Sequence, residues 1–228
     1  LIALHTMQRE LSASLKCVLV GDAAVGKTVL VEAYTKNTFN DNYTATTFDN
    51  YSVTVNVDNK PLRIDISDTA GVATFDSLRP LSYAEANVFL LCFKVTDIRT
   101  LNSITEQWLP EIRAVSPHVP VILVGTQQDM RLGYTDPRFI VDPKRVRRLA
   151  EQLNIDYIEC SALTHRNLKA VFDLAILNGL KNAGQRNQLS QPIKKSTFIN
   201  STSAPPLPEK HRTNSLKDGF RRLVRKLL

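Results

Sequence analysis

The pattern of apolar and polar residues along the chain predicts strands that alternate with helices. Mostly apolar runs at residues 16–20, 88–93 and 119–124 are typical of strands buried on both faces, and a shorter run at 157–160 predicts one more. Residues 51–57 and 62–66 alternate apolar with polar side chains, and the polar residues 58–60 join them. This alternation predicts an antiparallel hairpin, so that six strands are expected in all.

Four further segments predict helices. Residues 27–36 contain neither glycine nor proline, the pair Asp142 and Pro143 is typical of a helix start, and Gly184 is the expected stop of a closing helix at about 167–182. The residues expected to face the core in the last three helices are Leu101, Ile104, Trp108, Ile112 and Val115, then Val146, Leu149 and Leu153, then Leu168, Val171, Phe172, Ala175 and Ile176. The elements together predict an α/β fold, with a mostly parallel sheet, one antiparallel edge strand and helices on both faces.

A glycine-rich loop follows the first strand and opens the first helix, with the pattern G-x-x-x-x-G-K-[ST]. It consists of Gly21, Asp22, Ala23, Ala24, Val25, Gly26, Lys27 and Thr28. This arrangement aims backbone N–H groups and the positive end of a helix at phosphates. Lys27 is expected to reach the β- and γ-phosphates, and the Thr28 hydroxyl is expected to ligate Mg²⁺. The loop therefore predicts a P-loop NTPase fold that binds a nucleoside triphosphate.

Three more polar segments follow predicted strands, at the sheet edge where ligands bind in such folds. Asp68 can hold Mg²⁺ through a water, and the N–H of Gly71 can meet the γ-phosphate. Asp129 can accept from both N1–H and the 2-amino group of guanine, a pair of donors that adenine lacks. The other residues expected at the nucleotide are Thr126 and Gln127, and Ser161, Ala162 and Leu163, whose backbone can donate to the guanine O6. The ligand is therefore expected to be GTP.

The chain resembles the small GTPases, and within them the Rho/Rac family, over residues 16–184. Six stretches carry the resemblance: GDAAVGKT (21–28), TTFDNY (46–51), DTAG (68–71), FDSLRPLSY (75–83), VGTQQD (124–129) and ECSALT (159–164). It implies a Ras-like G domain with GTP or GDP and Mg²⁺, in which Thr46 closes on Mg²⁺ and the γ-phosphate and Phe39 leans on the guanine. Residues 43–51 and 70–83 are expected to be the two switches, with Asp49 in an effector surface.

Two departures from the family oppose hydrolysis. The family's DTAG is normally followed by a glutamine that orients the attacking water, and here that residue is Val72. The phosphate loop normally has a second glycine where this chain has Ala23, whose methyl group would crowd the arginine of an activating protein. We expect a signalling switch that hydrolyses GTP slowly, stays largely GTP-loaded and recruits effectors at membranes for cytoskeletal or related signalling. Two alternatives remain open: an adaptor whose nucleotide is structural, and an ordinary cycling enzyme.

Two further departures concern partners. Ser67 stands where Rac-like members carry tryptophan and their relatives phenylalanine, at a position the family uses to choose exchange factors. Only 30 residues separate Asp129 from Cys160, so the helical insert typical of Rho proteins is expected to be shortened.

Charge divides the chain into a near-neutral body and a basic tail. Of the net charge of +7, residues 185–228 contribute 10 Lys and Arg against 2 Asp and Glu, whereas residues 1–184 hold 19 against 20. The body therefore shows no basic face for nucleic acid. The three cysteines all lie in apolar runs, which is typical of reduced core thiols in a cytoplasmic protein.

The tail lacks the prenylation box with which family members usually end, because no cysteine follows Cys160. Residues 213–228 place apolar and basic residues on opposite helical faces, which predicts an amphipathic helix on an anionic membrane; docking on a partner or on the domain itself is the alternative. Before it, residues 185–212 are expected to form a disordered linker, with an SH3-type ligand or a plain spacer at Pro205–Pro208. The G domain is expected at 14–184, after an extension at 1–13 without an assigned role, in a monomer peripheral to a membrane.

Overall fold

The computed structural model describes residues 14–37, 48–71, 79–133 and 138–189. The strands are β1 (Ser14–Val20), β2 (Phe48–Val57), β3 (Lys60–Thr69), β4 (Val88–Lys94), β5 (Val121–Thr126) and β6 (Asp156–Glu159). The helical elements are α2 (Lys27–Lys36), α3 (Arg79–Ser82), α4 (Ile98–Ser103), the π-helical turn η2 (Ile104–Trp108), α5 (Leu109–Val115), the 3-10 helix η3 (Gln128–Leu132), α6 (Pro143–Leu153) and α7 (Leu168–Leu189).

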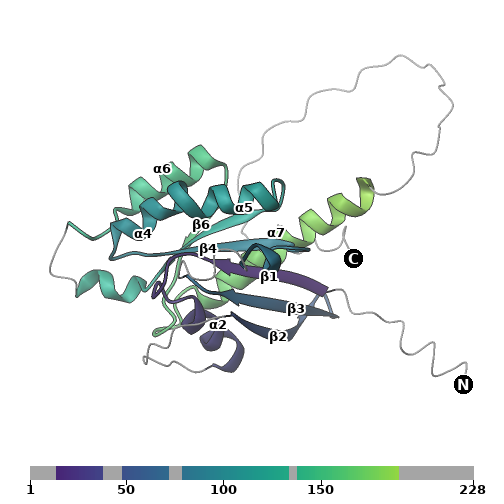
Figure 1. The fold of residues 1–228 in the computed structure, drawn as a ribbon. Helices are drawn as coiled ribbons and strands as arrows, with labels where there is room; N and C mark the ends of the chain where they lie inside the picture. Colours follow the sequence, from purple (N-terminus) through teal and green to yellow (C-terminus); the bar gives the residue numbers. More distant parts are fainter. Residues whose placement is uncertain (1–13, 38–47, 72–78, 134–137, 190–228) are drawn as a thin grey trace, which may run out of the picture.

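The strands form one sheet in the order β2-β3-β1-β4-β5-β6, drawn edge to edge in Figure 1. Only β2 and β3 pair in antiparallel fashion, and the other neighbouring pairs are parallel. The predicted fold class is therefore confirmed. The direction in which the chain adds strands reverses at β1, because the β2–β3 hairpin lies on one side of β1 and β4 lies on the other. The loop after β1 therefore lies at a topological switch point, where open α/β sheets bind ligands.

The hairpin is closed by the two residues between β2 and β3. Asp58 has a φ of 48° and Asn59 a φ of 64°, so both adopt the left-handed conformation. Two consecutive positive φ values give a turn whose twist matches that of the flanking strands, and Asp and Asn tolerate this conformation well. Both strands are longer than predicted, and β3 continues through Asp68 to Thr69.

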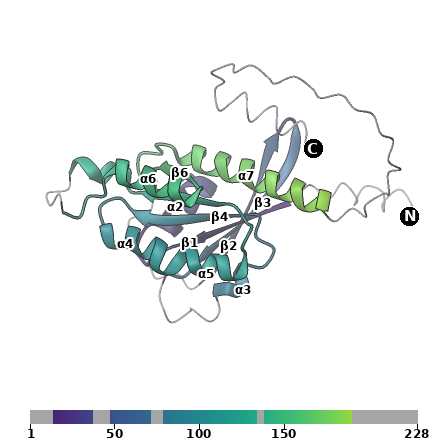
Figure 2. The same ribbon diagram turned by 90° about the horizontal axis from the view of Figure 1, so that it is seen from above.

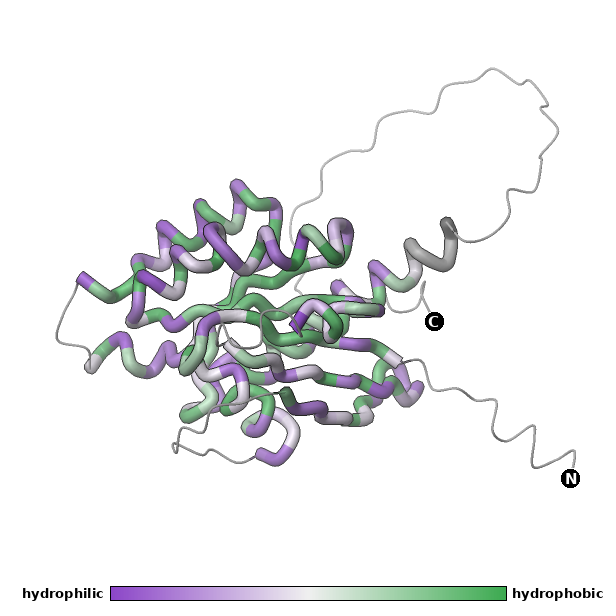
Figure 3. Tube along the Cα trace, in the orientation of Figure 1, coloured by the Kyte–Doolittle hydropathy of each residue, from purple (hydrophilic) through white to green (hydrophobic). Residues whose placement is uncertain are grey.

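Two hydrophobic cores lie on opposite faces of the sheet. Helices α2 and α7 cover one face, where Leu30, Val171 and Phe172 belong to a single buried cluster with residues of β1 and β3. Helices α4, α5 and α6 pack against the other face, where Ile104 and Val146 belong to the second cluster; Figure 2 shows α4 and α5 on the side of the sheet opposite α7. Figure 3 shows the apolar residues concentrated along the central strands, while the helices alternate between apolar and hydrophilic positions.

The helices follow the sequence pattern with three corrections. The side chain of Asp142 accepts from the N–H of Lys144 and caps α6 as predicted. Val115, however, is 46% exposed, because it is the last residue of α5 and the chain turns away at Ser116. Leu149 and Leu153 are only partly buried. Gly184 does not stop α7, which runs on to Leu189, because one glycine costs a helix only about 1 kcal/mol. The prediction that a disordered linker starts at residue 185 is therefore wrong at its start, because residues 185–189 belong to α7.

Every cysteine of the chain is buried and free, as the sequence predicted. Burial raises the pKa of the Cys92 thiol to about 12, because a thiolate would lose its hydration there. Burial also raises the pKa values of the Cys17 and Cys160 thiols. None of the described helices is long and apolar enough to cross a membrane.

Candidate functional site

The glycine-rich loop connects β1 to α2, and geometry requires both of its glycines. Gly21 has a φ of 143°, and a Cβ there would lie 2.2 Å from the carbonyl oxygen of Cys92 in β4. Gly26 is the N-cap of α2 and has a φ of 94°. Side chains other than hydrogen are strained in this conformation. The loop therefore packs closely on the sheet and leads directly into the N-terminus of α2, where backbone N–H groups can bind an anion.

Lys27 lies folded against this loop. Its side-chain nitrogen donates to the carbonyl oxygens of Gly21 (2.8 Å) and Asp22 (2.9 Å), and the residue is only 6% exposed. Burial lowers the pKa of the Lys27 amine, since a buried ammonium loses its hydration, although nearby acidic groups oppose this effect. Phosphate oxygens at the loop would supply the counter-charge that this ammonium needs.

Thr28 and Asp68, which the sequence analysis expects at a magnesium site, meet beside the loop. The Thr28 hydroxyl donates to Asp68 Oδ2 at 2.5 Å, whereas Asp68 Oδ1 is buried and has no hydrogen-bond partner among the described residues. Burial raises the pKa of the Asp68 carboxyl to about 6, against the opposing effect of the Thr28 hydrogen bond. A buried carboxylate with one unsatisfied oxygen fits a cation held through a water.

The protein supplies few metal ligands of its own. No group of three or more His, Cys, Asp and Glu residues that could hold a metal occurs in the described ranges. Mg²⁺ commonly binds through one or two protein groups together with waters and substrate phosphates. The Thr28 hydroxyl and the Asp68 carboxylate therefore fit a metal that arrives with a nucleotide.

Gly71 lies directly against the phosphate loop. A Cβ at Gly71 would lie 2.3 Å from the nitrogen of Ala23 and 2.4 Å from the carbonyl carbon of Asp22. The segment after β3 therefore approaches the loop more closely than any side chain allows. This contact brings Gly71 beside Ala23, the residue that replaces the family's second glycine.

Two loops at the ends of β5 and β6 form the part of the site predicted for guanine. The N–H of Gln128 donates to the carbonyl of Cys160 (3.0 Å), so the two loops are joined. The N–H of Ser161 donates to the carbonyl of Arg166, so a donor to the guanine oxygen is expected from Ala162 or Leu163 instead. Within the described part of the chain, the carboxylate of Asp129 has no hydrogen-bond or ion-pair partner and is free to accept from a base.

Thr126 connects two loops of the site, a structural role that the sequence did not predict. Its hydroxyl donates to the carbonyl of Val25 in the phosphate loop at 2.5 Å and lies 2.9 Å from the carbonyl of Phe93. Thr126 is only 3% exposed. It thus ties the base loop to the phosphate loop across 101 residues of sequence.

Trp108 and Arg79 also support the phosphate loop; Arg79 lies in the second switch that the resemblance implies, whereas Trp108 was missed as a functional residue. The indole N–H of Trp108 donates to Asp22 Oδ1 (2.6 Å), and the guanidinium of Arg79 lies over the indole ring at 4.6 Å. Arg79 Nε donates to the carbonyl of Ala70 (2.9 Å), and its Nη1 pairs with Glu111 (2.9 Å). The sequence pattern assigned Trp108 only to a core-facing helix stripe, and spacing gives no sign of a partner 86 residues away.

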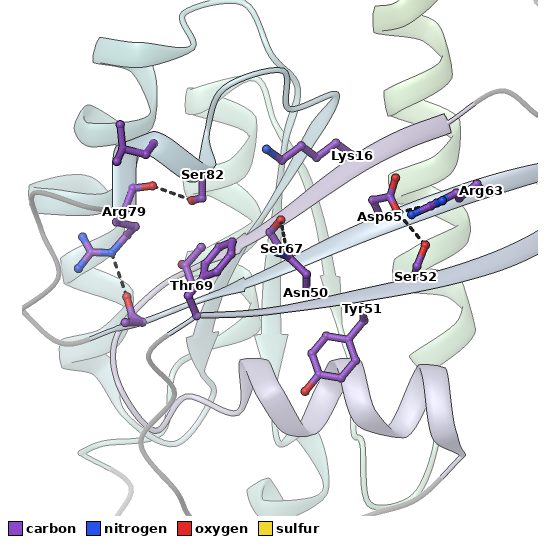
Figure 4. A pocket seen from close by; sticks show the side chains of 13 residues that line it. Lys16, Asn50, Tyr51, Ser52, Arg63, Asp65, Ser67, Thr69, Arg79 and Ser82 are labelled. Atoms are coloured by element: carbon purple, nitrogen blue, oxygen red, sulfur yellow. Dashed lines mark hydrogen bonds and ion pairs between the residues drawn. The ribbon is translucent and has the colours of Figure 1, made fainter. Parts of the chain in front are cut away.

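A groove of about 810 Å³ runs along the exposed face of β2 and β3 (Figure 4). Ser67 lies in its floor and donates to Asn50 Oδ1 at 2.9 Å, while Asp65 binds both Ser52 and Arg63 at one end. Arg79 and Ser82 line the other end. The exposed apolar residues Phe48 (44%) and Leu81 (72%) border it. The small Ser67 side chain leaves this floor open where a bulky aromatic residue would fill it.

Several expected residues lie outside the described ranges. These are Phe39, Thr46 and Val72, residues 43–47 of the first switch and 72–78 of the second, the extension at 1–13 and the tail from residue 190. Asp49, at the end of the first switch, belongs to β2 and is exposed. Between η3 and α6 no helix is present in the described residues 138–142.

The sequence matches the Ras family over residues 16–181. The Rho-related GTP-binding protein RhoV of Rattus norvegicus is 46% identical over 177 residues, which cover 74% of this chain and 75% of the relative. RhoV of Homo sapiens and of Bos taurus show the same identity and coverage.

The sheet order, with a phosphate loop at its switch point, defines a P-loop GTPase fold of the Ras type. The likeness to RhoV is more specific, because it extends over three quarters of both chains. This chain belongs to the Rho family of small GTPases, which are GTP-binding signalling switches that work with Mg²⁺.

Proposed function

We propose that this chain is a GTP-binding switch that holds GTP and Mg²⁺ but hydrolyses GTP slowly, and that it is therefore largely GTP-loaded. The observation that carries the proposal is the contact of Gly71 with the Asp22–Ala23 peptide. This contact brings the segment that leads to Val72 against Ala23. By analogy with the family, Ala23 and Val72, the two residues that depart from its pattern, are both expected to act at the γ-phosphate end of the nucleotide.

In this proposal the nucleotide is held by residues of several separate segments. Lys27 leaves the carbonyls of Gly21 and Asp22 to bind the β- and γ-phosphates, while Thr28 ligates Mg²⁺ directly and Asp68 holds it through a water. Asp129 reads the guanine, and the backbone at Ala162 or Leu163 binds its oxygen. Thr46 and Phe39 complete the set by analogy with the family.

Both departures weaken hydrolysis for physical reasons. A valine at 72 can neither donate nor accept a hydrogen bond, so it cannot orient the attacking water. The Ala23 methyl group occupies space that the arginine of an activating protein would need, and such an arginine accelerates hydrolysis by about 10³–10⁵. Intrinsic and stimulated hydrolysis are therefore both expected to be slow.

Single-turnover hydrolysis of bound GTP, with and without a Rho activating protein, tests this proposal. We expect little acceleration for the natural chain and a partial gain for the double variant Val72→Gln with Ala23→Gly. The two single variants are the matched controls, because each restores one of the two features. A large acceleration of the natural chain would overturn the proposal.

The second candidate is an adaptor in which the nucleotide is structural, and the burial of Lys27 and Asp68 favours it. A site closed by such buried groups could retain one nucleotide permanently. The nucleotide content of the purified chain separates the candidates. Mostly GTP that exchanges with added nucleotide supports the switch, GTP or GDP that does not exchange supports the adaptor, and mostly exchangeable GDP supports an ordinary cycling enzyme.

Partners are proposed at the two switches, residues 43–51 and 70–83. The open groove over Ser67, bordered by the exposed Phe48 and Leu81, supports binding of an effector or exchange factor there. Apolar residues with this exposure beside a concave floor are typical of protein interfaces. Pull-down with GTP-loaded and GDP-loaded protein tests the switch, because an effector is retained by the GTP form alone.

Residues 213–228 are proposed to bind an anionic membrane, and Pro205–Pro208 to bind an SH3-type groove. The sequence pattern of each segment is its support. Co-sedimentation with vesicles tests the first of these. Equal binding to neutral and anionic vesicles would remove the electrostatic argument, and loss of binding after removal of residues 213–228 would place the contact in this segment.

A further inference from the structure

Helix α6 carries a cluster of four cations at its surface. Lys144, Arg145, Arg147 and Arg148 lie within five consecutive positions, and all four are exposed. None of them forms an ion pair with any residue of the described ranges. The cluster does not reflect a generally basic body, because residues 1–184 are close to neutral.

The position of the cluster is unfavourable for the isolated chain. Lys144 and Arg145 belong to the first turn of α6, which contains no acidic residue. The N-terminus of a helix carries partial positive charge, so cations there are destabilising, and the Asp142 cap offsets this only in part. Because the fold does not favour positive charge at this end of α6, we infer that the cluster binds an anionic group outside the chain.

Two of these arginines line a groove of about 290 Å³ between α6 and the helix that begins with α4. Arg145 and Arg148 form one side of it, and Asn102 and Thr105 form the other. Arg145 Nη2 lies 3.4 Å from Asn102 Oδ1, a weak contact that leaves its other donors available. The partly buried Leu149 adds an apolar surface between the polar groups. The groove thus offers two guanidinium groups and one apolar contact.

The chemistry of this groove selects its occupant. The basic tail of this chain, with 10 Lys and Arg against 2 acidic residues in 185–228, would be repelled. A membrane surface is broad and flat, whereas Arg145 and Arg148 face a recess between two helices, which an extended peptide can enter. Guanidinium groups bind carboxylates in paired hydrogen bonds.

We propose that the groove between α4 and α6 binds an acidic segment of a partner protein. Carboxylates of this segment pair with Arg145 and Arg148, and an apolar side chain of it packs on Leu149. None of the groove residues belongs to the phosphate loop or to the two switches, so the surface is separate from the one proposed for effectors. A partner held here could remain bound while the switches change.

The test uses the full chain with bound nucleotide and a fluorescent peptide of glutamates with interspersed leucines. Its matched control peptide has glutamine in place of every glutamate. Fluorescence anisotropy at low salt should show binding of the acidic peptide alone, weakened as salt rises to about 0.15 M. The double variant Arg145→Glu with Arg148→Glu should weaken it at least about tenfold, since two ion pairs become repulsions.

The control variant is Lys169→Glu with Lys181→Glu, which changes the net charge equally on exposed positions of α7. It should bind the acidic peptide as the natural chain does. Equal loss in both double variants would show a non-specific charge effect and overturn the proposal, as would failure of the natural chain to bind the acidic peptide. If the Arg145 and Arg148 changes reduce binding to anionic vesicles but not to the peptide, the groove is a lipid contact and the proposal is wrong.

Thermal stability gives an independent readout. Because Arg145 lies at the positive end of α6, Arg145→Glu alone should raise the melting temperature by about 1–3 °C while weakening peptide binding. A variant that gains stability and loses the ligand cannot owe the loss to misfolding. A lower melting temperature would show that Arg145 serves the fold, and the proposal would fail.

Discussion

The substitution Gly71→Ala tests how the segment after β3 contributes to the site. The added Cβ would lie 2.3 Å from the nitrogen of Ala23 and 2.4 Å from the carbonyl carbon of Asp22, whereas comfortable contacts are about 3.5 Å or longer. Both neighbours are backbone atoms of the phosphate loop and cannot rotate away. The peptide between Ala70 and Gly71 must therefore move by about 1 Å, which takes the Gly71 N–H out of hydrogen-bond range of a γ-phosphate.

The size of the effect follows from the bond that is lost. A hydrogen bond to a charged group contributes about 1.5–3 kcal/mol, so GTP should bind about tenfold to a hundredfold more weakly. GDP has no γ-phosphate, and its affinity should change by about threefold at most. Dissociation rates of fluorescent GTP and GDP analogues, measured in excess Mg²⁺, give both numbers. Equal losses for GTP and GDP would refute the reasoning, because they would show a general disturbance of the loop.

Three further predictions concern the fold, the base and the thiols. Gly179→Ala should lower the free energy of unfolding, measured by urea denaturation, by about 1 kcal/mol. The new Cβ would lie 2.5 Å from Leu15 Cδ1 in the core, and this overpacking outweighs the gain in helix propensity. The control Gly133→Ala, where the new Cβ would have no atom within 4 Å, should change the free energy of unfolding by less than about 0.5 kcal/mol. Asp129→Asn should shift nucleotide preference from GTP toward XTP, because an amide can donate to the second carbonyl of xanthine; competition binding that still favours GTP would remove Asp129 from the base site. The folded chain should show no thiol that reacts rapidly with a disulfide reagent at pH 8, because the pKa of Cys92 is raised to about 12 and those of the other two thiols are also raised; a fast-reacting thiol in the native chain would contradict this burial.

The strands were predictable because the apolar and polar residues within each strand record which of its faces are buried. The apolar run of β4 and the alternation along β2 both report local burial, and the structure confirms them. Helix ends were less predictable. Gly184 was expected to stop α7, but a weak local preference does not outweigh the packing of the helix before it, where Val171 and Phe172 are buried.

The candidate site was likewise predictable where it depends on local spacing and less so where it depends on contacts between distant residues. The spacing from Gly21 to Thr28 fixes a loop that can bind phosphate, since the pattern itself contains the glycines, the lysine and the hydroxyl that this chemistry needs. The meeting of Thr28 with Asp68, 40 residues apart, followed from the sequence only because both were expected at the same sheet edge.

The sequence by itself therefore determined the order of the elements, the phosphate loop and the family, because these depend on local residue types and their spacing. Only the tertiary structure decided what supports the loop: Trp108 on Asp22, the Thr126 hydroxyl on Val25 and the close approach of Gly71 to Ala23. It also brought α4 and α6 together around the groove at Arg145. Such contacts join residues far apart in the chain, and their geometry arises from packing on the sheet, which no local pattern records.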